Sequence, residues 1–292
     1  MQRLPLPEEI ADHYARTMAE ARGDYIHYRW GSSEVKRRHF RQTSRALQRV
    51  LGSVNSLGDV LEVGCGPAVW TPLYAGRARS VFLLDISQAM LEKAKDRLAD
   101  WGGSGLSDKV TYHCGDFITA ALEDARFDTI ISVRALEYMS DKPAFTRKCH
   151  RLLRTGGSLI VVTKNRHWID NTLEMKTVEK EPQESIPVEV RMQTDLLSWT
   201  DLMSLFRSSG FASARSFPVV VGSYLRPLAC GPGLWACDLL HRLLYTRSLS
   251  PLYAPLVESF LTVGEKDVFS SRQRSMAGKP RGRTSGEGVV RV

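Results

Sequence analysis

A short glycine-containing stretch between two apolar runs is the part of this chain whose spacing points most directly to chemistry. The first run, residues 59–63, leads into the turn GCG at residues 64–66, and the second run, residues 80–84, ends on Asp85. A turn of this kind exposes backbone N–H groups, and an acid about 20 residues later can accept hydrogen bonds from two ribose hydroxyls. The spacing therefore predicts a site for an adenosine-containing cofactor.

Two familiar nucleotide-binding motifs do not fit this turn. The dinucleotide fingerprint G-x-G-x-x-G needs a third glycine, where this chain has Val69. The phosphate-binding loop needs Gly-Lys followed by Ser or Thr, and no such triplet follows the turn. What remains is Glu62 directly before the glycines and Asp85 at the end of the next apolar run, so the cofactor is of another kind.

Taken in order, several segments of the chain resemble the class I S-adenosylmethionine-dependent methyltransferases. The resemblance begins with VLEVGCG, which is similar to the first motif of that family, and it extends more loosely to about residue 267. The matching segments are residues 59–68, 81–86, 113–117, 127–139 and 148–165. The resemblance implies S-adenosylmethionine as the cofactor.

The resemblance also implies roles for the residues of the turn. Gly64 and Gly66 would let the backbone approach the methionine part of the cofactor, and Cys65 would occupy a position in the turn that needs a small residue. Glu62 would orient either the turn or the amino group of the cofactor. We do not interpret Cys65 as a nucleophile.

Later strand ends would supply the remaining cofactor contacts. Asp85 would accept hydrogen bonds from the ribose hydroxyls, with Ile86 against the adenine, while Asp116 would accept from the adenine amino group beside Phe117. The backbone of Arg134 would face the sulfonium. Two simpler interpretations stay open: Asp85 as an exposed acid at a strand end, and Asp116 as a helix N-cap.

Methyl transfer from a sulfonium is a direct displacement, so the protein mainly orients the reactants, excludes water and sometimes provides a base. His167 and Glu137 follow predicted strands on the correct edge of the sheet and are the candidate bases; an incidental surface histidine is the alternative for His167. No metal-binding motif is present.

The alternation of short apolar runs with helical patterns predicts an α/β protein. The resemblance implies a Rossmann-like, seven-stranded, mostly parallel sheet with helices on both faces, whose last two strands form an antiparallel hairpin. Expected strands are residues 59–63, 80–85, 109–113, 127–133, 157–163, 211–223 and 259–266. Expected helices are residues 69–77, 88–99, 142–154 and 198–210.

We expect three regions along the chain. Residues 1–57 would form a helical cap, and one of its aromatic residues Tyr14, Tyr25, Tyr28 and Trp30 could cover the cofactor. Residues 58–267 would form the methyltransferase domain, with a helical insertion at about 224–258 as a substrate lid or dimer surface. Residues 268–292 would be a disordered basic tail, because they carry six basic residues, one acid and few large apolar groups.

Composition limits the remaining alternatives. The 292 residues are 43% hydrophobic with a net charge of +8. No secretory signal or membrane span is evident, and five scattered cysteines favour reduced thiols, so we expect a cytoplasmic protein.

The basic segment 34–51 predicts either a solvated helix packed on the sheet or a contact with an anionic substrate or membrane surface. The oligomeric state stays open.

The sequence favours a methyltransferase for a small-molecule or lipid-like acceptor, with oxygen weakly preferred. Residues 134–137 read RALE, where methyltransferases of nucleobase amines carry an Asn-Pro-Pro-Tyr-like tetrad, which argues against nucleic acid. An RNA or protein methyltransferase is the alternative enzyme. A non-catalytic partner subunit with the same fold is the alternative outside enzymes.

Overall fold

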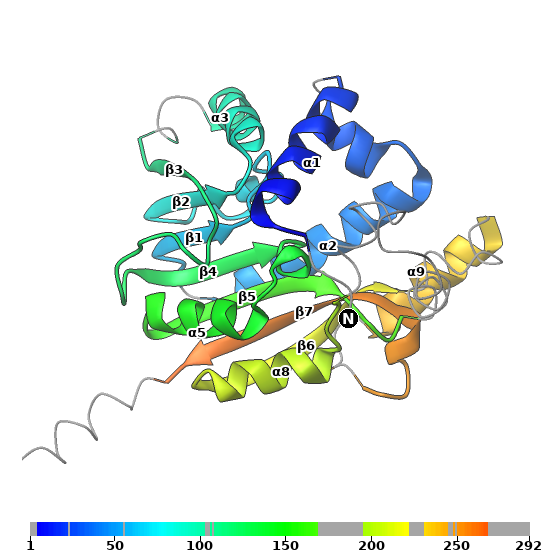
Figure 1. The fold of residues 1–292 in the computed structure, drawn as a ribbon. Coiled ribbons are helices and arrows are strands. Elements are labelled where there is room, and N and C mark those ends of the chain that lie inside the picture. The colour runs from blue at the N-terminus through cyan, green and yellow to red at the C-terminus, as the bar shows by residue number, and fades with distance from the viewer. Residues whose placement is uncertain are drawn as a thin grey trace, which may run out of the picture.

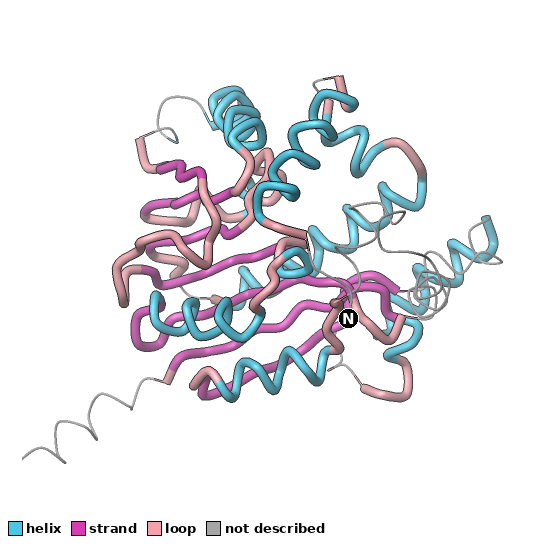
Figure 2. The backbone as a smooth tube through the Cα atoms, in the orientation of Figure 1, coloured by secondary structure: helices cyan, strands magenta, loops and turns pink. Residues whose placement is uncertain are grey.

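The computed structural model describes residues 5–22, 24–54, 56–102, 106, 108–168, 195–221, 231–244, 248 and 250–267. In this part of the chain, seven strands form one sheet in the order β3-β2-β1-β4-β5-β7-β6 (Figures 1 and 2). The strands are β1 (Asp59–Val63), β2 (Ser80–Asp85), β3 (Val110–Cys114), β4 (Phe127–Val133), β5 (Leu153–Lys164), β6 (Phe211–Val221) and β7 (Val257–Lys266). The first five are parallel, and β7 pairs antiparallel with both β5 and β6. The expected Rossmann-like sheet is confirmed.

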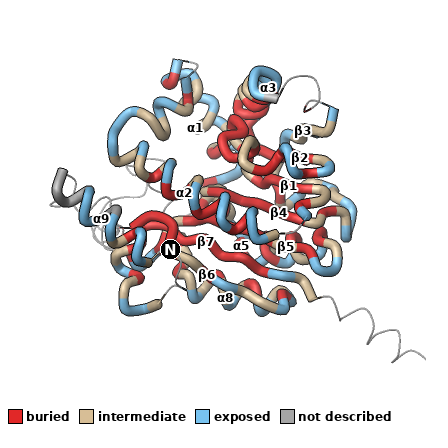
Figure 3. The backbone as a smooth tube through the Cα atoms, turned by 180° about the vertical axis from the view of Figure 1, so that it is seen from behind, coloured by how far each residue is buried: buried red, intermediate tan, exposed pale blue. Residues whose placement is uncertain are grey.

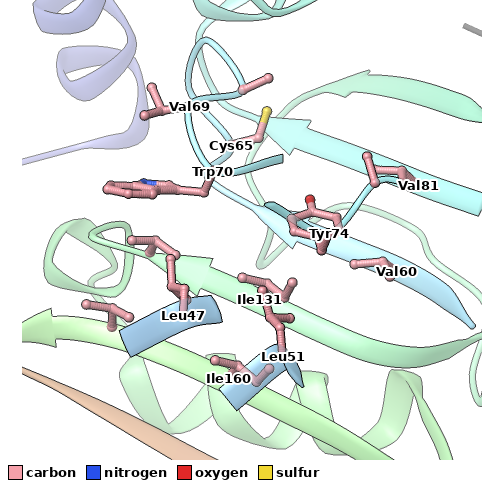
Figure 4. Close-up of a cluster of buried hydrophobic side chains, with 14 of the residues drawn as sticks. Leu47, Leu51, Val60, Cys65, Val69, Trp70, Tyr74, Val81, Ile131 and Ile160 are labelled. Carbon is pink, nitrogen blue, oxygen red and sulfur yellow. The ribbon is translucent and has the colours of Figure 1, made fainter. Parts of the chain in front are cut away.

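Helices cover both faces of this sheet because successive residues of each strand point to opposite sides. Val60 belongs to the core cluster under α2 (Glu34–Ser53) and α3 (Gln88–Gly102), whereas Leu61 belongs to the cluster under α5 (Lys142–Leu152) and α8 (Trp199–Ser208). Figure 4 shows Leu47 and Leu51 of α2 against Ile131 of β4 and Ile160 of β5. Seen from behind, the central strands are almost entirely buried (Figure 3).

The helix after β5 begins and ends as the sequence predicts. Ser198 caps α8 by accepting the backbone N–H of Asp201, and the Asp201 carboxylate accepts the N–H of Ser198 in return. Helix α9 (Gly231–Leu244) lies in the predicted insertion, and β7 begins at Val257, two residues earlier than expected.

The predicted helix at residues 69–77 is wrong. The chain forms only a single 3-10 turn there, η2 (Thr71–Leu73), followed by further turns. Pro72 explains the difference, because it has no N–H to donate to the carbonyl of Ala68 and it disfavours a helical conformation of Thr71. Ala68 itself has a φ of +54°, which is incompatible with a right-handed helix.

The N-terminal segment lies above the sheet edge where the parallel strands end (Figure 1). It contains α1 (Pro7–Glu20) and the short π-helix η1 (His27–Gly31), followed by α2. Ala21 and Tyr25 pack against Met90 of α3, and this contact holds the N-terminal segment against α3. Residues 169–194 and the predicted basic tail at 268–292 lie outside the described residues. Within the described part, none of the helices has the length and apolar character needed to cross a membrane.

Candidate functional site

A cavity lies at the carboxyl ends of β1, β2 and β4, which is where open parallel sheets bind ligands. It encloses about 1230 Å³, including its open mouth. The floor is formed by residues that follow the strands, and the roof comes from the N-terminal segment. The predicted site residues that line it are Gly64, Cys65, Gly66, Asp85, Ile86, Asp116, Phe117 and Arg134.

Asp85 connects the end of β2 to the glycine turn. One carboxylate oxygen accepts the backbone N–H of Gly66 at 2.7 Å, and the other accepts the N–H of Ser87 at 2.9 Å. Burial raises the pKa of Asp85, while these backbone donors act in the opposite direction. The carboxylate is 7% exposed and lines the cavity, so it is not a solvated strand-end acid.

The two glycines of the turn meet different surroundings. Gly64 has a φ of +69°, and a Cβ added there would lie 2.3 Å from the Cβ of Ala135. Gly66 has a φ of +51°, but nothing lies within 4 Å of where its Cβ would be. The first glycine is therefore required by packing against the loop after β4, whereas the second leaves space open beside Asp85.

Glu62 does not line the cavity but holds the segment that follows the glycine turn. Its side chain is buried, and one carboxylate oxygen accepts hydrogen bonds from the hydroxyls of Thr71 and Tyr74. Burial raises the pKa of Glu62 to about 7. Of the two roles that the sequence left open for Glu62, the geometry supports the structural one.

One side of the cavity is formed by the loop after β3. Asp116 accepts the N–H of Ile118 at 3.2 Å, which makes it a turn residue and not the cap of a helix. The buried ring of Phe117 packs against Phe145 of α5. The ammonium of Lys148, also on α5, donates to the backbone carbonyls of Phe117, Ile118 and Ala120. The Lys148 ammonium therefore fixes the loop that carries Asp116 and Phe117.

The candidate bases are positioned differently from the cofactor residues. Glu137 is 1% exposed, pairs with Arg134 at 2.8 Å and accepts the backbone N–H of Lys164. Arg134 has a φ of +62°, and its side chain also donates to Ser259. His167 is exposed. Neither Glu137 nor His167 is among the residues that line the cavity.

Three of the four aromatic residues singled out in the N-terminal segment reach the cavity. Tyr14, Tyr25 and Trp30 line it, whereas Tyr28 is 40% exposed. Sequence reasoning missed several further lining residues, among them Arg29, Trp70 and Tyr138. In the sequence, Arg29 lies directly between Tyr28 and Trp30, and this position is the one local signal that could have identified it.

An adenosine-type cofactor fits the residues present. Asp85 offers a buried acceptor, the space beside Gly66 is open, and Ile86 and Phe117 provide apolar walls. Among the described residues, no group of three or more His, Cys, Asp or Glu side chains is arranged to hold a metal ion.

Comparison with known proteins decides between cofactor classes. A family model described as a methyltransferase domain matches residues 60–157, which include β1, the glycine turn, Asp85 and Asp116. Over residues 60–157 the chain is therefore similar to methyltransferase domains, and proteins described as S-adenosylmethionine-dependent methyltransferases are among its relatives. The matched residues include every cofactor-binding residue predicted from the sequence.

The relatives of this chain include bacterial and plant proteins. The chain is 28% identical over 192 residues to a probable S-adenosylmethionine-dependent methyltransferase from Mycolicibacterium smegmatis, which is 66% of this chain and 65% of that protein. It is 28% identical over 127 residues to a probable chloroplastic tocopherol O-methyltransferase from Oryza sativa, which is 43% of this chain and 33% of that protein. Both matches span less than two thirds of the relative.

The fold of this chain also has close solved counterparts. Magnesium protoporphyrin IX methyltransferase from Synechocystis, with S-adenosylhomocysteine bound, superposes with a TM-score of 0.60 over 89% of this chain and 100% of that chain. The sequence identity is 16%, so this likeness concerns the fold alone.

Proposed function

We propose that this chain is an enzyme that binds S-adenosylmethionine in the cavity and transfers its methyl group to the oxygen of a small, lipid-like acceptor. The observation that carries the proposal is the buried Asp85 carboxylate, which lines the cavity beside the open space at Gly66. A buried carboxylate in this position is suited to accept two ribose hydroxyls.

The roles of the chain's own residues follow from this arrangement. Asp85 holds the ribose, Ile86 and Phe117 enclose the adenine, and Asp116 accepts from its amino group. When bound, the cofactor supplies an electrophilic methyl group together with its leaving group. The N-terminal segment covers the cavity and excludes water, so the chain contributes mainly orientation and desolvation.

Neither of the two candidate bases lines the cavity. Glu137 is committed to Arg134 and to the N–H of Lys164, and His167 is exposed outside the cavity lining. A hydroxyl that is already acidic, such as a phenol, needs little assistance from a base. This argument supports an oxygen acceptor, as does the relative named as a tocopherol O-methyltransferase.

A small apolar acceptor is supported over a macromolecule by the surroundings of the cavity. Trp30, Val69, Trp70 and Met90 give it apolar walls. The basic residues of α2 are partly neutralised within the helix, because Glu34 pairs with Arg37, Arg38 and Arg41. This arrangement favours a solvated helix over an RNA-binding surface.

Calorimetry with the demethylated cofactor, S-adenosylhomocysteine, tests the proposal. We expect Asp85→Ala to weaken binding at least about 100-fold, because two hydrogen bonds to a buried charge are lost. Asp96→Ala, an exposed acid of α3, is the matched control and should bind as the wild type does. A wild-type protein that binds no S-adenosylhomocysteine would instead indicate a non-catalytic partner subunit.

A transfer assay then separates the acceptor classes. The protein is incubated with methyl-tritiated S-adenosylmethionine and either a lipid extract or total RNA. We expect label in the lipid fraction that is absent with Asp85→Ala. Label confined to RNA or protein would contradict the proposed acceptor while leaving the cofactor site intact.

A further inference from the structure

Four polar side chains line the cavity close to one another, three from its roof and one from its floor. Tyr14 comes from α1, Tyr25 precedes η1, Arg29 lies in η1, and Tyr138 lies in η3 (Leu136–Tyr138), just after β4. The rings of Tyr14 and Tyr138 meet edge-on with centroids 5.7 Å apart. The Arg29 guanidinium donates to the hydroxyl of Tyr25. We refer to these four residues as the roof cluster.

The roof cluster combines one guanidinium with three tyrosine hydroxyls. Burial raises the pKa of Tyr14, with further increases from Tyr138 and Tyr25. Burial likewise raises the pKa of Tyr25 to about 12. Burial alone would lower the pKa of Arg29, but its tyrosine neighbours and Glu137 raise it overall. Tyr14 and Tyr25 therefore stay protonated, and Arg29 stays charged.

Arg29 differs from the other arginine of the cavity in what balances its charge. Arg134 pairs with Glu137 at 2.8 Å and lies 3.7 Å from Glu258. Among the described residues, no carboxylate forms an ion pair with Arg29, and Glu137, the acid that influences its pKa, is held by Arg134 and the N–H of Lys164. A charge-bearing guanidinium thus faces the cavity without its own counter-ion in this part of the chain.

The proposed function makes this charge significant, because the bound cofactor would bring a sulfonium cation into the same cavity. Two cations in a partly buried space repel each other, and a nearby anion would offset that repulsion. We propose that the roof cluster is a binding subsite for a carboxylate or similar anionic group. This inference rests on the proposed function. The anion could come from the cofactor's own α-carboxylate or from an acidic acceptor, and both would be recognised by the same guanidinium and hydroxyl donors.

The source of the anion can be tested with two ligands that differ in one group. S-adenosylhomocysteine and its decarboxylated analogue are titrated calorimetrically into the wild type and Arg29→Gln. If the α-carboxylate is the anion, the wild type should prefer S-adenosylhomocysteine by about 10- to 100-fold, and Arg29→Gln should abolish that preference. Tyr138→Phe should reduce it by a smaller factor, since only one donor is lost.

A second titration identifies an acceptor anion. Benzoate is titrated into the S-adenosylhomocysteine complex and into the free protein. If the acceptor supplies the anion, the wild type should bind benzoate, Arg29→Gln should not, and the preference between the two cofactor analogues should be unaffected by the substitution. Arg37→Gln removes an exposed arginine of α2 and should change neither measurement.

The outcomes also distinguish this inference from the proposed function. If Arg29→Gln alters neither the cofactor preference nor benzoate binding while retaining the wild-type melting temperature, the subsite is refuted. If the wild type binds neither cofactor analogue, the proposed function fails, and benzoate binding by the free protein still decides whether the roof cluster binds anions.

Discussion

Each carboxylate oxygen of Asp85 accepts one backbone N–H group, from Gly66 on one side and from Ser87 on the other. A carboxylate has about four lone-pair positions, so two remain for hydroxyl donors of a ligand. The same side chain therefore holds the glycine turn against the end of β2 and keeps acceptor capacity at the cavity. A ligand does not have to break the turn in order to bind.

The two glycines of the turn should respond differently to substitution. Gly64→Ala would place a methyl group against Ala135 in a conformation with positive φ. We expect it to lower the free energy of unfolding by about 3 kcal/mol, from backbone strain and overpacking together. Denaturation with urea measures this loss.

Gly66→Ala is the matched comparison. Its φ is also positive, but the added methyl group would meet no neighbouring atom, so we expect a loss of only about 1 kcal/mol. The methyl group would instead occupy space at the cavity, and binding of S-adenosylhomocysteine should weaken at least about tenfold. Equal losses of stability in the two variants would contradict this distinction.

At the scale of elements, the segment between β1 and β2 is held by buried hydrogen bonds in place of a helix. Thr71 and Tyr74 turn back to donate to Glu62, whose pKa burial raises to about 7 from an ordinary value of 4.5. Between these two pH values, the folded protein binds more protons than the unfolded chain does. The stabilisation is complete below pH 4.5 and is lost as the pH rises through 7.

Glu62→Gln should remove this pH dependence. The amide keeps an acceptor for Thr71 and Tyr74 but does not titrate. Between pH 5 and pH 8, we expect the wild type to lose about 2–3 kcal/mol more unfolding free energy than the variant loses. Urea denaturation at the two pH values provides the measurement, and parallel losses in both proteins would show that Glu62 is charged throughout.

Lys148 links α5 to the loop that carries Asp116 and Phe117. Lys148→Met would leave three backbone carbonyls without their ammonium donor. We expect a loss of about 2 kcal/mol in stability and roughly tenfold weaker binding of S-adenosylhomocysteine, measured by urea denaturation and calorimetry. Arg147→Met, on the exposed side of the same helix, should leave binding unchanged. Unchanged binding in Lys148→Met as well would mean that the loop keeps its shape unaided.

The sequence was sufficient for the elements whose signals are local. Strand ends, the capping of α8 by Ser198 and the cofactor class could all be inferred from spacing and residue type. The sequence pattern at 69–77 predicts a helix, but Pro72 limits the segment to a single 3-10 turn, and the role of Glu62 depends on that segment folding back. The roof cluster could not be predicted, because Arg29 and Tyr138 come from distant parts of the chain and share no motif.

At the scale of the molecule, the sheet and its glycine turn form the floor of the cavity, and the N-terminal segment covers it. Helix α9 packs against β6, and Trp235, Leu239 and Leu243 lie four residues apart on one face of it. These side chains are 67%, 44% and 58% exposed. We propose that this exposed apolar stripe contacts a lipid surface, in keeping with the lipid-like acceptor proposed above.

Replacing the stripe tests this expectation. The triple variant Trp235→Ser, Leu239→Ser and Leu243→Ser should lose most of the wild type's sedimentation with phosphatidylglycerol vesicles, because the apolar area available for burial in lipid is removed. Trp101→Ser, an exposed tryptophan of α3, is the matched control and should sediment normally. Wild-type protein that stays in the supernatant would contradict the membrane contact.

The position of β7 has a consequence for biosynthesis. This strand follows β6 along the chain, yet it lies between β5 and β6, and it is the strand to which β6 is hydrogen-bonded. During translation, β1 to β5 therefore emerge from the ribosome before β6 and can pair with one another. The backbone groups of β6 stay unpaired until residue 266 has emerged. Arrested translation products that end between residues 221 and 257 should consequently be the species most in need of a chaperone.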